Sequence, residues 1–147
     1  MNDVPLKTSR ILFLAILNAQ LLVPGILFAV RQPAPANANS AQTLTYVAVG
    51  MLVVVLALVQ VVRGQVAAWM KENADTALAA VRDGKVPGRA HSLALMQAAA
   101  LEMPALVAGV ALFFGAPPAL GAVPLTTVVL TLWVMPTAGA LERMAQD

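Results

Sequence analysis

The chain has 147 residues, of which 60% are hydrophobic and only 11% are charged. A soluble domain carries about 25% charged residues, so this composition excludes an ordinary soluble domain and indicates a single-domain membrane protein over residues 1–147. The absence of cysteine excludes disulfides and thiolate metal sites, and a single histidine, His91, excludes bis-histidine haem ligation within one chain. We therefore expect no metal and no cofactor.

Four apolar segments follow one another along the chain, each close to the ~20 residues that a helix needs to cross a hydrocarbon core. They are residues 11–30, 44–62, 93–114 and 119–138. Leu, Val, Ala and Ile occupy nearly every position, and no segment alternates as a membrane strand does. The sequence therefore predicts an all-α membrane protein, built as a four-transmembrane-helix bundle.

The first segment also has some features of a secretory signal. Basic residues precede its apolar run, and the small residues 36–38 follow it like a cleavage site. The run is long for a signal, and Asn18, Gln20 and Pro24 interrupt it. These features favour a retained span.

The basic residues predict the topology. Eight of the nine lie before the first span, between the second and third, or after the fourth. The positive-inside rule then places both termini and the middle connection in the cytoplasm. We expect a multi-pass protein of the bacterial inner membrane, whose net charge of +2 reflects this bias and not nucleic-acid binding.

The connections differ in character. Residues 64–89 are expected to begin as a cytoplasmic continuation of the second span and to turn back after Asp83-Gly84. This segment is either a docking surface for a cytoplasmic partner or a solvated connector. Residues 32–43 read as an external, non-helical linker, and residues 115–121 as a tight external turn.

One carboxylate stands inside the third segment. Glu102 recurs with small residues at helical spacing, which predicts a helix-packing face that lets two helices approach closely. The small residues of this face are Ala94, Ala98, Ala105 and Gly109. Glu102 lies about 13–14 Å beyond the start of the segment, near the bilayer midplane, and is expected to point into a helix contact.

Burial at this depth favours the neutral, protonated form of a carboxyl group. Glu102 is therefore the candidate proton- or ion-binding residue, since intramembrane carboxylates mark ion pathways and proton relays. Pro104 supports this role because it leaves the carbonyl of Ala100 without its helical donor. The alternative is that protonated Glu102 only hydrogen-bonds across the bundle. Asn18, Gln20, Thr127 and Thr131 lie at matching depth as supporting partners.

The third segment resembles the carboxylate-bearing helix of the proteolipid (c) subunit of rotary ATP synthases. The resemblance rests on Arg89, the apolar stretch, Leu101-Glu102-Met103-Pro104, Val107-Ala108-Gly109 and Phe113-Phe114. It implies that Glu102 carries the translocated ion and that Pro104 is the matching proline. The second span, with Gly50 alone, lacks that family's glycine repeat. The whole chain is more similar to small uncharacterised bacterial four-span proteins that are not rotor subunits.

Three functions remain open. The chain is an oligomeric proton- or cation-handling subunit, a structural or assembly subunit of a larger membrane complex, or a small-solute transporter acting as a dimer. The expected partners are the lipid bilayer and a second copy or other membrane subunits. No catalytic set accompanies Glu102, so we do not expect an enzyme.

Overall fold

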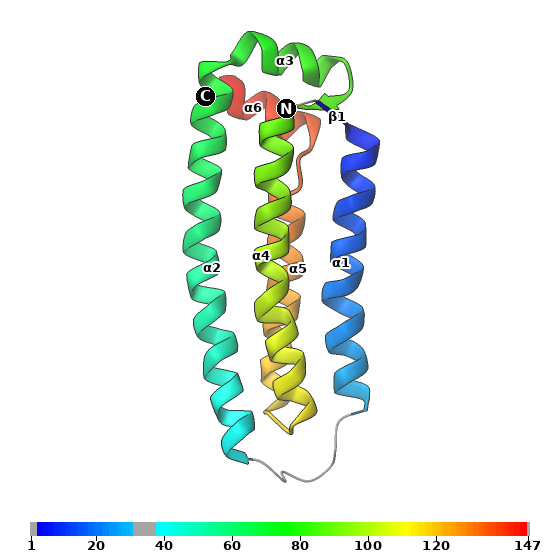
Figure 1. Cartoon of the computed structure of the whole chain (residues 1–147), viewed down its shortest axis with the longest axis vertical. Helices are drawn as coiled ribbons and strands as arrows, with labels where there is room; N and C mark the ends of the chain where they lie inside the picture. Colours follow the sequence, from blue (N-terminus) through cyan, green and yellow to red (C-terminus); the bar gives the residue numbers. More distant parts are fainter. Residues whose placement is uncertain (1–2, 31–37, 147) are drawn as a thin grey trace.

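The computed structural model describes residues 3–30 and 38–146 and consists almost entirely of helix. Four helices lie side by side along the long axis: α1 (Leu6–Ala29), α2 (Ala38–Glu72), α4 (Gly88–Phe113) and α5 (Ala122–Val134) (Figure 1). The first three are long and apolar enough to cross a membrane. The fold is a helical bundle that fits a multi-pass membrane protein.

The surface of the bundle has the composition expected for contact with lipid. Large apolar side chains are exposed on several helices, among them Leu22 at 61%, Val54 at 68% and Leu125 at 61%. Exposure of this apolar surface to water would be unfavourable, whereas acyl chains solvate it as well as a protein core does.

Helix α4 is the central helix, in contact with α1, α2 and α5. Its packed face is made largely of small residues, and Ala98, Ala105, Ala108 and Ala111 are fully buried. Small side chains allow backbones to approach closely where lipid supplies no hydrophobic drive for association. The approach is close at Gly109, where an added Cβ would lie 2.9 Å from the Cα of Pro24 on α1.

A small cap closes one end of the bundle. Helix α2 continues to Glu72, past the predicted span, and is followed by α3 (Ala74–Arg82) and the strand β2 (Lys85–Val86), which pairs with β1 (Val4–Pro5). Gly84 makes the turn between α3 and β2 with a φ of 71°, a conformation that favours glycine. Its carbonyl accepts the N–H of Leu6 at 2.9 Å, so the start of α1 is tied to the cap.

The fourth predicted span, residues 119–138, is not one continuous helix. It consists of η1 (Pro118–Gly121) and α5, and α5 ends at Val134; the chain then bends by 65° into α6 (Ala138–Gln146). Pro136 explains the break, because it disfavours a helical Met135, which adopts ψ 125°. The 4 residues of η1 and 13 of α5 still measure about 27–28 Å together, close to the thickness of a hydrocarbon core.

The predicted linker 32–43 is corrected in part. Helix α2 already begins at Ala38, so its second half is helical. Residues 31–37 lie outside the described residues, as does most of the small-residue segment 36–38.

The basic residues of the described chain gather at the capped end, which also holds α3 and α6 (Figure 1). We call it the basic end. The set comprises Lys7, Arg10, Arg63, Lys71, Arg82, Lys85, Arg89 and Arg143.

Candidate functional site

Glu102 lies near the middle of α4, at the border between its packed and its outward face. Its side chain is half-buried, between Leu101, which is fully buried, and Met103, which is 51% exposed. Within residues 3–30 and 38–146, it takes part in no hydrogen bond or ion pair. The carboxyl therefore has no internal partner in the part of the chain that the structure describes.

The helical repeat of 3.6 residues explains this position, because steps of four residues do not return to the same side of the helix. Two steps of four residues turn a helix by 800°, so Glu102 lies about 80° round α4 from Ala94. The centre of the buried face instead follows Ala94, Leu101 and Ala105, which are all buried. Ala98 and Gly109 are buried as well. Glu102 thus lies at the margin of the small-residue face.

The residues predicted to support Glu102 are either exposed or hydrogen-bonded to other groups. Asn18 is exposed, and the buried Thr127 donates its hydroxyl to the carbonyl of Pro124 at 2.8 Å. The buried Gln20 donates Nε2 to Oγ1 of Thr131 at 3.0 Å, and its Oε1 lies 3.1 Å from the same hydroxyl. Nε2 also lies 3.4 Å from the carbonyl oxygen of Ala98. These contacts join α1, α4 and α5, and we call them the polar junction.

A double-mutant cycle measures the coupling free energy between Gln20 and Thr131 in the polar junction. Gln20→Met and Thr131→Val each remove one partner, and the coupling between them is expected to be about 0.6–1.7 kcal/mol, as for other hydrogen bonds between membrane helices. The measurement is the free energy of unfolding of wild type, both single variants and the double variant in detergent titrations. Strictly additive losses would show that the Gln20–Thr131 bond adds nothing to stability.

Pro104 is fully buried, and it removes the helical donor to the carbonyl of Ala100. The side-chain donor that reaches α4 nearby, Nε2 of Gln20, lies against a different carbonyl, that of Ala98. Pro104 therefore packs in the α4 interior without a described polar contact at Ala100.

Two further polar contacts hold α4, and sequence reasoning did not identify either pair. Oγ of Ser9 on α1 lies 3.1 Å from Nδ1 of His91, and both residues are buried. Gln97 is also buried, and it donates to the carbonyl of Val59 on α2 at 3.1 Å. With the polar junction, α4 is hydrogen-bonded to α1 and to α2, and Gln20 links α1 to α5.

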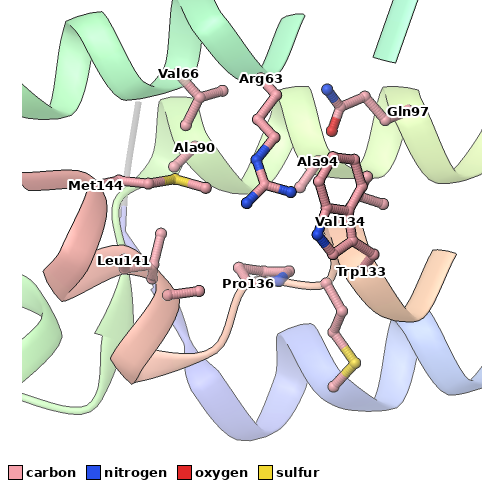
Figure 2. A pocket seen from close by; sticks show the side chains of 12 residues that line it. Arg63, Val66, Ala90, Ala94, Gln97, Trp133, Val134, Pro136, Leu141 and Met144 are labelled. Carbon is pink, nitrogen blue, oxygen red and sulfur yellow. The ribbon is translucent and has the colours of Figure 1, made fainter. Parts of the chain in front are cut away.

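A second site lies at the basic end, and it too was missed. The guanidinium carbon of Arg63 on α2 lies 3.7 Å from the ring centroid of Trp133 on α5, a cation–π contact. Nη1 of Arg63 is buried without a hydrogen-bond partner in the described structure. Figure 2 shows this guanidinium beside the Trp133 indole, in a cavity of about 30 Å³ that Leu141 and Met144 of α6 also line.

A larger groove adjoins this cavity. It measures about 620 Å³, and Arg63, Trp133, Ala140 and Met144 line both spaces. Lys71 and Arg143 add two further positive charges to the groove. The sequence held one signal for it: basic residues follow the second and fourth spans, and a tryptophan stands near the end of the fourth.

Comparison of the chain with protein-family models, with curated proteins and with solved structures found no match. The likeness of α4 to the proteolipid helix therefore stands on the sequence resemblance alone.

Proposed function

We propose that this chain is a subunit of the bacterial inner membrane that acts as an oligomer or within a larger membrane complex, and that Glu102 binds a proton or small cation there. Both termini and the basic end would face the cytoplasm. The observation that carries the proposal is the half-buried Glu102, placed mid-helix without an internal polar partner in the described chain.

The energetic argument starts from the cost of charge in the bilayer. An ionised carboxylate at mid-depth costs several kcal/mol unless it is paired or reaches water. No partner is described within the chain, so the low-energy states are a protonated carboxyl, a bound cation, or a contact with a helix of another subunit. Because Met103 next to it faces outward, the margin of α4 that carries Glu102 is open to such a helix. The proteolipid resemblance favours the same role.

Carbodiimide labelling tests this role, because these reagents modify protonated carboxyls in apolar surroundings. In native membranes we expect labelling of Glu102 that falls as pH rises and that sodium or another bound cation reduces. Mass spectrometry of the modified peptide locates the label, and Glu142, which is exposed on α6, serves as the internal control. A Glu102 that stays unlabelled at every pH would argue against a titrating site.

The alternative is a non-catalytic structural or assembly subunit. The hydrogen bonds that join α4 to α1 and α2, and α1 to α5, favour it, because they describe a bundle held in one arrangement. The two functions differ in their response to Glu102→Gln and Glu102→Leu. Glutamine keeps a hydrogen-bonding side chain, so a structural subunit should assemble with Gln and fail with Leu. An ion-handling subunit should assemble with Gln and lose its cation response.

The remaining candidate, a dimeric small-solute transporter, requires a cavity lined by Glu102 of two copies. The cavity and the groove described above lie at the basic end, and Glu102 lines neither of them. The partner proposed for residues 64–89 would meet a folded surface, since α3 packs against α6.

A further inference from the structure

The open groove at the basic end lies where α2, α5 and α6 meet. It exists because Pro136 ends α5 and α6 leaves at 65°, so that the side of α2 is not covered by a continuing helix. Trp133 belongs to the last turn of α5, and Arg63 lies about 13–14 Å along α2 from its end at Glu72. The groove therefore opens at the level where the apolar surface of the bundle gives way to its polar cap.

Among the described residues, the charged side chains that line the groove are all basic. They are Arg63, Lys71 and Arg143, and alanines, Met144 and Trp133 make up the rest of the described lining. Nε of Arg143 donates to the carbonyl of Gly139 at 3.0 Å, which occupies one of the five N–H donors of that guanidinium. The guanidinium groups of Arg63 and Arg143 beside one space create a local positive potential that attracts an anion.

Arg63 is the residue that most needs such an anion. Its guanidinium carbon lies over the Trp133 ring, 3.7 Å from the ring centroid, and this contact holds the planar group in place. The buried Nη1 has no acceptor among the described residues. A buried donor without a partner is costly, and a charged one more so, which makes an oxygen-rich anion beside it favourable.

From these contacts we infer that the groove binds the phosphate of an anionic phospholipid. Phosphate oxygens match the guanidinium edge of Arg63, and basic pockets between membrane helices are suited to acidic headgroups. Two observations favour a lipid over a free phosphate. Trp133 is 45% exposed, as aromatic residues at the headgroup level are. The remaining lining is apolar, since Ala67 and Ala68 of α2 and Ala140 and Met144 of α6 form it, and acyl chains can lie along such a surface.

Fluorescence quenching by brominated lipids tests the inference. In a Trp69→Phe background, Trp133 is the single tryptophan of the chain. The protein is reconstituted in phosphatidylcholine vesicles containing phosphatidylglycerol, with bromine on the acyl chains of one lipid at a time. We expect phosphatidylglycerol to quench Trp133 at much lower mole fraction than phosphatidylcholine. Arg63→Gln or Arg143→Gln should each weaken this preference by about fivefold.

Arg82→Gln is the matched control, since it removes the same charge from the exposed surface of α3, at the same end of the bundle. It should leave the preference unchanged. An equal loss in Arg82→Gln would show a diffuse surface charge and overturn the site. Arg143 is exposed, so Arg143→Gln should fold normally, and an unchanged preference in that variant would also overturn it. If inorganic phosphate suppressed the preference, the groove would bind a soluble phosphate, and the inference that it binds a phospholipid would be overturned.

Discussion

Gly109→Ala is expected to destabilise the bundle by about 1–3 kcal/mol, because the added methyl group has no room between α4 and α1. Its Cβ would lie 2.9 Å from the Cα of Pro24 and 3.2 Å from Cδ1 of Leu27. The nearest atom belongs to the backbone of a helix, so relief requires that α1 move as a whole. Such a shift would also lengthen the hydrogen bonds of the polar junction, which Gln20 makes one turn earlier. The measurement is the free energy of unfolding in a detergent titration.

Gly50→Ala is the control for this substitution. Gly50 lies within α2, is exposed, and has no atom within 4 Å of an added Cβ. Alanine favours a helix over glycine by about 1 kcal/mol, so this variant should be as stable as the wild type or more stable. Equal effects of the two substitutions would contradict a close contact between α1 and α4 at Gly109.

Much of the helical architecture could be predicted from hydropathy, because long apolar runs in a weakly charged chain have few other stable structures. The end of α3 at Arg82 and the turn at Gly84 could be predicted from Asp83-Gly84 for a local reason, the positive φ that glycine tolerates. The bend before α6 had a local signal too, in Met135-Pro136. Hydropathy concealed it, since residues on both sides of the proline are apolar.

The candidate sites depend on facts that no local pattern contains. Spacing of four residues suggested that Glu102 shares the small-residue face, but the accumulated drift places it at the margin. Which polar side chains meet depends on the rotation and depth of each helix. Gln20 and Thr131 are 111 residues apart in the chain, and nothing in the sequence showed that they would pair with each other and not with Glu102.

The Arg63 site shows the same limit more clearly. In the sequence, Arg63 is only one of the basic residues that predict the topology, and no local pattern relates it to Trp133. Their stacking requires that α2 and α5 be neighbours and that α5 end at the same level. A groove formed by the end of one helix and the departure of the next becomes visible only in three dimensions.

Phe13→Ala is expected to cost the bundle about 2 kcal/mol or more. Phe13 is fully buried in a cluster with Ala94 and Ala98 of α4, against which Val134 at the end of α5 and the following Met135 also pack. In a soluble core, Phe→Ala costs about 3–5 kcal/mol, of which part is transfer from water and part is the cavity left behind. In a bilayer the side chain stays in apolar surroundings when the helices separate, so the transfer part is small and the lost packing remains.

Leu14→Ala separates these two contributions, because Leu14 is the next residue of α1 and is 53% exposed. Its side chain faces lipid in the bundle and after helix separation, so truncation should change the free energy of unfolding by less than about 0.5 kcal/mol. A large loss for Leu14→Ala would mean that this face of α1 is covered by another subunit in the membrane. A small loss for Phe13→Ala would mean that α1 does not pack on α4 as described. The pair therefore reports both on the interior of the bundle and on whether this side of it meets lipid or protein.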